Sequence, residues 1–185
     1  MKRLDKNILA ARMGLEKESL RVDRRGRLAQ TPHPFPEDAE LDVDFSGNQL
    51  EFITGVCDSA DAAWEDLRRL HRKAARVLEN RETGPEYLWP FSNPPYVQAE
   101  GENPPMEFYG EKAWKTEYRN HLKERYGTQL MLYSGIHFNL SFPAAFWSTI
   151  SPGTDKDAAY LNLAAWATRY AWLIVYLFAA SPVLD

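Results

Sequence analysis

The chain has 185 residues, with 22 Lys and Arg against 26 Asp and Glu and a formal net charge of −4. Hydrophobic content of 44% and aromatic content of 13% exclude a disordered chain, and the acidic balance argues against a nucleic-acid-binding protein. The length is that of one domain. A lone cysteine, Cys57, excludes an intramolecular disulfide and predicts a reducing, cytoplasmic location.

The first half of the chain predicts two strands. Residues 14–22 form a strand pattern that ends at a turn signal, Asp-Arg-Arg-Gly, and three prolines then predict an extended loop over residues 31–40. Residues 41–54 return to a strand pattern. Gly47 lies in the middle of it, which indicates a bulge or bend.

Two helices and a long loop follow. Apolar residues recur on one face of residues 61–80, which predicts an amphipathic helix whose buried stripe includes Trp64 and Val77. Residues 81–110 contain six prolines and predict a functional loop, such as a lid or binding segment. Residues 111–126 predict a helix that Gly127 ends.

The last part predicts a strand and a helix. In residues 131–142, Ile, Phe and Leu alternate with polar residues, which predicts a strand with one face on a core. Residues 158–180 are strongly apolar. Asn162 and Arg169 interrupt them, and the run AWLIVYLFAA is about half the length that a membrane span needs. We therefore expect a buried helix and no membrane association, with a partner-docking helix as the alternative. The fold expected is α+β, a mainly antiparallel sheet with helices on its apolar face.

Several side chains with potential chemistry fall on the predicted strands. Glu16 and Glu18 are two residues apart and therefore share one face of the first strand. Asp44 and Glu51 lie on the second strand and differ in parity, so only a bulge at Gly47 would bring them to one side. His137 lies on the polar face of the third strand. If the three strands are neighbours, these groups share one surface; otherwise Glu16 and Glu18 are an ordinary solvated pair.

Four carboxylates with one imidazole are unstable together without cations. Oxygen-rich sites of this kind suit Mg²⁺ or Mn²⁺, and several carboxylates suggest more than one ion. Zinc is disfavoured because its sites prefer thiolates and several histidines. Cys57 follows a strand beside Asp58, and a carboxylate neighbour raises a thiol pKa, which argues against a catalytic thiolate.

Six motifs in order resemble glutamate–cysteine ligase, also called γ-glutamylcysteine synthetase. The resemblance extends from about residue 14 to residue 182 and is closest to the ligase domain of the bifunctional bacterial glutathione synthase. The motifs are GLEKESLRV (14–22), TPHP (31–34), VDFSGNQLEFIT (43–54), LWPFSNPP (88–95), YR (118–119) with RYG (125–127), and YSGIHFNLSFPAAFW (133–147).

The resemblance implies a curved antiparallel sheet like that of glutamine synthetase. It also implies ATP-dependent joining of the glutamate γ-carboxyl to the cysteine amine through a γ-glutamyl phosphate, the first step of glutathione biosynthesis. Tyr118, Arg119 and Asn139 would lie near the amino-acid substrates, and Arg119 would act in catalysis by pairing with a substrate carboxylate. The metal ligands implied, for Mg²⁺ or Mn²⁺, are Glu16, Glu18, Asp44, Glu51 and His137.

The sequence also departs from the family. Gly47 replaces an acidic residue found in most relatives, and family ligase domains continue beyond the motif at 180–182. Residues 1–185 are therefore expected to be the N-terminal portion of one ligase domain. Two alternatives remain: a ligase of the same fold with another amine acceptor, and a non-catalytic fragment. Such a fragment would dock to the missing part of the ligase, or self-associate, through its apolar C-terminal helix.

Overall fold

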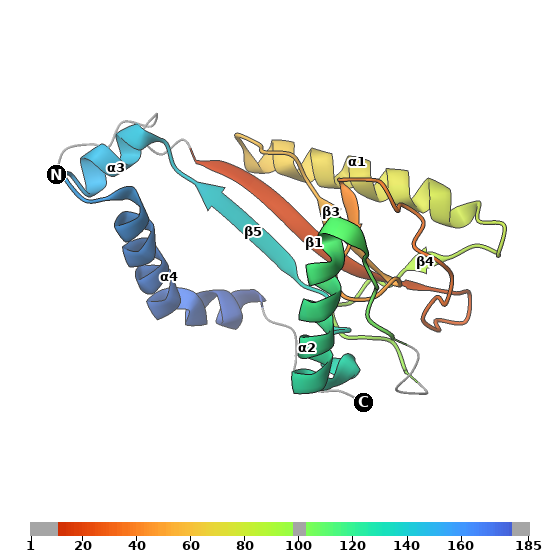
Figure 1. The fold of residues 1–185 in the computed structure, drawn as a ribbon. Helices are drawn as coiled ribbons and strands as arrows, with labels where there is room; N and C mark the ends of the chain where they lie inside the picture. The colour runs from red at the N-terminus through yellow and green to blue at the C-terminus, as the bar shows by residue number, and fades with distance from the viewer. Residues whose placement is uncertain (1–10, 98–102, 179–185) are drawn as a thin grey trace. The chain divides into compact units, whose positions relative to one another are not determined.

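The computed structural model describes residues 11–97 and 103–178 (Figure 1). The chain forms two compact units, one over residues 12–140 and one that includes residues 141–178. Each unit is described by itself. No helix in the described part of the chain is both long and apolar enough to cross a membrane.

An open sheet forms the centre of the first unit. Its strands are β1 (Arg12–Val22), β2 (Leu41–Val43), β3 (Gln49–Ile53), β4 (Tyr87–Leu88) and β5 (Ile136–Ser141). β1 pairs antiparallel with β3 and β4, β3 pairs antiparallel with β2, and β5 pairs with β1. The mainly antiparallel sheet expected from the sequence is thus observed, whereas its likeness to glutamine synthetase stays a prediction.

Residues 41–54 form a hairpin and not one bulged strand, so the sequence prediction was wrong here. β2 and β3 pair with each other, and the Gln49 N–H donates to the Ser46 carbonyl across the turn between them. The Ser46 hydroxyl also donates to the Asn48 side chain at 2.5 Å. Gly47 therefore belongs to a reversal of the chain, which places Asp42 and Glu51 opposite each other.

Helix α1 (Ala60–Glu79) covers one face of the sheet and starts at Ser59, whose side chain accepts from the Ala62 N–H. Its buried residues pack with sheet residues such as Leu50 and Phe52 into the main core. Trp64 and Val77 were expected in this stripe, but both are exposed, at 57% and 40%. The buried stripe consists of Ala63, Leu67, Leu70, Ala74 and Leu78.

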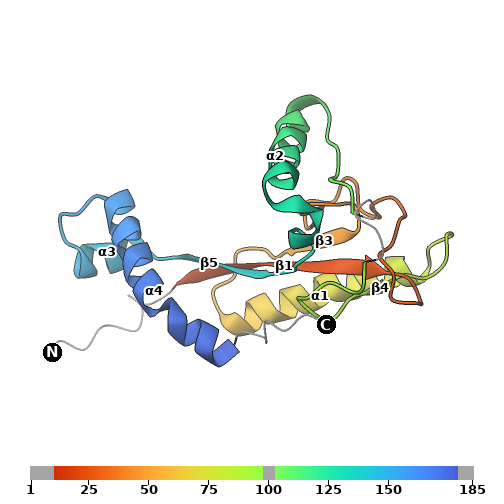
Figure 2. The same cartoon turned by 90° about the horizontal axis from the view of Figure 1, so that it is seen from below.

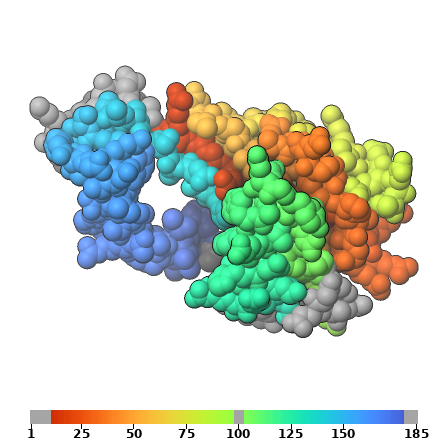
Figure 3. All heavy atoms as spheres, viewed as in Figure 1, coloured from red at the N-terminus to blue at the C-terminus, as the bar shows by residue number. Residues whose placement is uncertain are grey.

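A short 3₁₀ turn, η3 (Gly110–Lys112), precedes α2 (Ala113–Leu130), which is kinked at Gly127 with φ +76°. Helix α2 lies on the opposite side of the sheet from α1 (Figure 2), and its Arg119 and Lys115 contact residues 42–44 at β2. In Figure 3 the green surface of α2 adjoins the orange surface of the early part of the chain. The expectation of helices on one face only was therefore wrong. The reason is that α2 contacts the sheet through polar side chains, while its aromatic residues Trp114, Tyr118 and Tyr126 are exposed.

The second unit contains α3 (Ala144–Ile150) and α4 (Lys156–Phe178). Trp147 is buried there, packed edge-on against the rings of Phe142 and Phe146 and tilted against that of Tyr160. The Tyr160 hydroxyl also accepts from the Phe142 N–H at 3.0 Å. Among the described residues of α4 only Ala159 is buried.

Two burial predictions are therefore wrong. Most of α4 is exposed instead of buried, and so is β5, whose apolar residues Ile136, Phe138 and Leu140 are 49%, 71% and 55% exposed. Alternation identifies which residues share a face, but it carries no information on what covers that face.

Candidate metal centre

The register of three strands brings acidic residues together on one face of the sheet. Glu18 of β1 is paired with Glu51 of β3, and Glu51 is paired with Asp42 of β2. Three carboxylates therefore lie in one row across neighbouring strands, an arrangement that like-charge repulsion disfavours. Glu16 lies two residues from Glu18 and therefore on the same face.

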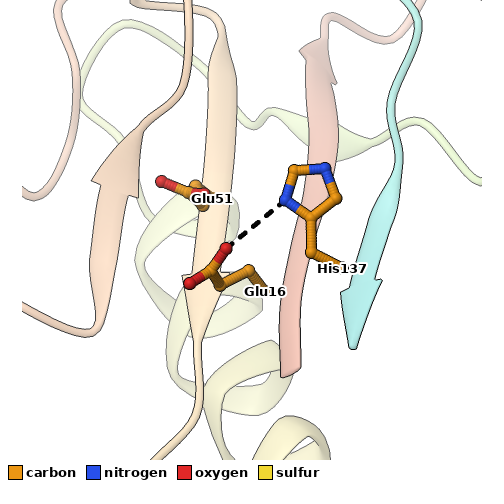
Figure 4. A group of neighbouring side chains, drawn as sticks. All are labelled: Glu16, Glu51 and His137. Carbon is orange, nitrogen blue, oxygen red and sulfur yellow. Dashed lines mark hydrogen bonds and ion pairs between the residues drawn. The ribbon is translucent and has the colours of Figure 1, made fainter. Parts of the chain in front are cut away.

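His137 of β5 completes the cluster. Its Nδ1 lies 3.3 Å from a Glu16 carboxylate oxygen, and its Nε2 lies 3.6 Å from one of Glu18. One ligand atom each from Glu16, Glu51 and His137 lie within 4.8 Å of one another. Figure 4 shows these three side chains pointing toward one another from three strands. The Asn139 amide donates to Glu16 at 3.0 Å.

The backbone of residue 135 fixes Glu18. The Gly135 N–H donates to its side chain at 2.8 Å, and the Glu18 N–H donates to the Gly135 carbonyl at 3.0 Å. A Cβ at position 135 would lie 3.5 Å from the His137 ring and 3.8 Å from the Glu18 carboxylate. Both are ordinary van der Waals distances, so residue 135 holds Glu18 through its backbone groups.

The carboxylates disfavour one another's ionisation. Burial raises the pKa of Glu51 to about 7, and the charges of Asp44, Glu16, Glu18 and Asp42 add to the rise. Burial also raises the pKa of Glu18 and of Asp44. A bound cation would reverse this tendency because it favours the charged carboxylates.

Arg119 of α2 is buried against the β2–β3 hairpin. Its Nε donates to the Asp44 carbonyl at 2.7 Å, and its Nη2 donates to the Val43 carbonyl at 2.8 Å. Its guanidinium also lies 4.6 Å from the Phe108 ring centroid. Most of its N–H donors therefore bind the backbone at the end of β2, next to the Asp44 side chain. Its Nη1 has no hydrogen-bond partner among the described residues.

Sequence reasoning missed Asp42, because a single strand over residues 41–54 hides its pairing with Glu51. The signal was the Ser-Gly-Asn turn, which suits a hairpin. The Lys115 ammonium of α2 lies 3.3 Å from the Asp42 carboxylate. Tyr118 is 57% exposed, and in the described part of the chain no hydrogen bond or ion pair joins it to the carboxylates.

The family model for glutamate–cysteine ligase matches residues 2–185. The chain is 39% identical to the bifunctional glutathione biosynthesis protein of Listeria innocua, over 97% of this chain and 25% of that protein. It is 37% identical to the glutamate–cysteine ligase of Bordetella petrii, over 93% of this chain and 34% of that protein.

A solved structure gives the same relationship. The chain is similar to the glutamate–cysteine ligase of Francisella tularensis, solved in complex with AMP, with a TM-score of 0.81 and 32% identity over 94% of this chain and 36% of that one. The chain thus spans about a quarter to a third of the length of these relatives. The match over nearly all its residues shows that the chain belongs to the glutamate–cysteine ligase family.

Proposed function

We propose that this chain forms the metal-binding part of a glutamate–cysteine ligase, an ATP-dependent enzyme of glutathione biosynthesis. The observation that carries the proposal is the convergence of Glu16, Glu51 and His137 from three strands, with ligand atoms within 4.8 Å of one another. Family membership supports the activity, and the AMP named in the Francisella structure supports a nucleotide substrate.

The donor set fits a hard divalent cation. Carboxylate oxygens dominate, as Mg²⁺ and Mn²⁺ prefer. Burial, and then the charges of the neighbouring carboxylates, raise the pKa of Glu51 to about 7, and a bound cation would oppose both effects. A divalent ion here would neutralise phosphate charge during phosphoryl transfer. The residues proposed to hold such ions are Glu16, Glu18, Asp44, Glu51 and His137.

The proposed reaction has two steps. A γ-carboxylate oxygen of glutamate attacks the γ-phosphorus of ATP, which forms γ-glutamyl phosphate and releases ADP. The cysteine amine then attacks the acyl carbon, phosphate leaves, and the amine loses a proton. Water would hydrolyse the acyl phosphate, and a segment within residues 81–110 is our candidate lid.

Three polar side chains are proposed to bind the amino-acid substrates: Tyr118, Arg119 and Asn139. Arg119 is proposed to pair with a substrate carboxylate through Nη1, which is buried and has no hydrogen-bond partner among the described residues. Its other donors hold the β2 end, so Arg119 would also position Asp44. Asn139 already donates to Glu16 and so would connect substrate and metal ligands.

We further propose that the rest of a ligase polypeptide covers the exposed apolar residues of β5 and α4. The relatives are about three to four times as long as the matched segment, so they have additional chain for this role. Exposed apolar surface on either element would otherwise promote association.

Metal binding tests the site. Titration with Mn²⁺, followed by its electron paramagnetic resonance signal, should give saturable binding that Mg²⁺ competes away. Glu51→Gln should weaken Mn²⁺ affinity by roughly tenfold or more, because even the loss of a residue that only hydrogen-bonds a metal ligand costs about tenfold. Glu79→Gln, at an exposed helix position, is the matched control and should bind as the parent does. Equal affinity of the two variants would overturn the site.

Activity tests the reaction. ADP release should require glutamate, cysteine and Mg²⁺, with the chain joined to or mixed with the remaining polypeptide of a ligase. Turnover without glutamate would contradict the proposal. Replacement of cysteine by other amines tests the alternative, because faster turnover with another amine would identify a ligase with a different acceptor.

A further inference from the structure

A second site lies at the end of the sheet where β1 gives way to the turn that follows it. The cavity has a volume of about 510 Å³, within the range of small-molecule sites. One wall is the hairpin of residues 23–31, and the other is the segment of residues 83–86 after α1. Figure 1 shows these two segments beyond the ends of β1 and α1, at the β4 side of the sheet.

The turn that carries the first wall is closed by its own hydrogen bonds. The Asp23 carboxylate accepts from the Arg25 N–H at 2.7 Å and from the Arg27 N–H at 3.0 Å. Gly26, at φ +75°, lets the chain reverse between them. These bonds also hold the pKa of Asp23 below its usual range. The turn is therefore ordered before any ligand arrives.

A buried network joins the two walls at their base. The Glu86 carboxylate accepts from the Arg21 guanidinium and from the Thr31 hydroxyl, and it lies 3.1 Å from the Arg81 guanidinium. Arg21 is fully buried and also donates to the Thr31 carbonyl at 2.9 Å. The loop after α1 is thereby fixed to the hairpin. Because two guanidinium groups already contact the Glu86 carboxylate, this carboxylate does not offer a cation site in the cavity.

The remaining charge of the lining is positive. Arg24, Arg25 and Arg27 all line the cavity, and none of them forms an ion pair with a carboxylate in the described part of the chain. The two acidic lining residues, Asp23 and Glu86, are engaged as described above. Three guanidinium groups on a chain of net charge −4 mark a local preference for anions.

We propose that this cavity binds a phosphorylated small molecule through Arg24, Arg25 and Arg27. Guanidinium groups match phosphate oxygens in a bidentate manner, and the cavity is large enough for a diphosphate with an attached group. The cavity is separate from the carboxylate cluster, since the cluster lies at Glu16 and Glu18 of β1 and the cavity begins at Asp23, just after the end of that strand. It does not depend on the proposed ligase function.

Calorimetry with the whole chain tests the proposal, with inorganic pyrophosphate and ADP as probes. The titrations are made in EDTA, so that anions cannot be held at the carboxylate cluster through a divalent ion. Both probes should bind saturably, and added salt should weaken binding. Similar affinities identify a site for the phosphates alone, whereas tighter binding of ADP shows that the nucleoside is also bound.

The variant with Arg24→Gln, Arg25→Gln and Arg27→Gln should lose affinity by about tenfold or more, because each guanidinium contributes a charged hydrogen bond. The control replaces Arg68, Arg72 and Arg76 of α1 with Gln and changes the net charge equally. Equal losses in the two variants, or unchanged binding in the first, would overturn the proposal. Because the replaced side chains are exposed, both variants should keep the circular dichroism spectrum of the parent.

Discussion

Glu51 makes the stability of the metal-free protein depend on pH. Its pKa is raised to about 7 in the folded chain, whereas an unfolded glutamate titrates near 4.3. Between these values the folded state binds more protons than the unfolded state, so the free energy of unfolding falls as pH rises toward 7. Because the site is partly open to solvent, we expect about 1–2 kcal/mol from this group.

Urea unfolding in EDTA at pH 5 and pH 8 measures this effect. Glu51→Gln should flatten the decline, and it should make the protein more stable than the parent at pH 8. Mg²⁺ should restore the stability of the parent at pH 8 but not that of the variant. A variant as pH-sensitive as the parent would show that Glu51 does not carry the effect.

Arg21 and Glu86 form a buried ion pair in the first unit. Their side chains are 0% and 4% exposed, and Arg21 also donates to the Gly47 carbonyl at 2.7 Å. Glu86→Gln would leave the Arg21 charge buried without its counterion. It should lower the free energy of unfolding by about 3–5 kcal/mol.

The matched control is Glu65→Gln, which breaks the exposed pair of Glu65 and Arg68 on α1. That change should cost no more than about 1 kcal/mol. Urea denaturation of both variants gives the comparison. A cost for Glu86→Gln as small as that for Glu65→Gln would mean that Arg21 is satisfied by its carbonyl acceptors alone.

At the scale of the element, α2 is attached to the sheet by polar contacts. Arg119 reaches the carbonyls of Val43 and Asp44, and Lys115 reaches the carboxylate of Asp42. A lysine at position 119 has one ammonium and cannot match the planar fork of arginine. Arg119→Lys should therefore destabilise the chain by about 1–3 kcal/mol.

The same variant should also weaken Mn²⁺ binding, because Asp44 would lose the support of its backbone. Thermal unfolding and Mn²⁺ titration measure the two effects. Arg125→Lys, at an exposed position of the same helix, should change neither. Loss of stability with unchanged metal affinity would show that α2 supports the fold but does not position the site.

Local sequence patterns predicted most helices and strands, but not which strands pair with one another. The period of apolar residues located α1 and β5, the turn signal after residue 22 located β1, and the parity of Glu16 and Glu18 placed them on one face. Parity could not place Asp44 and Glu51, because the hairpin depends on whether residues 44–48 bend or reverse the chain. The pairing of β5 with β1, which brings His137 to Glu16, is a long-range contact that no local pattern encodes.

At the scale of the whole molecule, exposed apolar surface should determine how the chain behaves in solution. Ile174 and Leu177 of α4 are 66% and 63% exposed, and the aromatic residues around them are exposed as well. Water disfavours such a surface by about 25 cal/mol for each Å² of apolar area. The isolated chain should therefore self-associate, and the remaining polypeptide of a ligase should suppress this by covering the same residues.

Sedimentation over a range of concentrations tests this expectation. Ile174→Glu with Leu177→Glu should shift the chain toward monomer, because each change places a charge on the associating surface. Asn162→Glu with Thr168→Glu adds the same charge to the same helix at polar positions and should shift it less. A parent chain that stays monomeric at every concentration would contradict the prediction. If the two double variants behaved alike, net charge and not this apolar surface would control association.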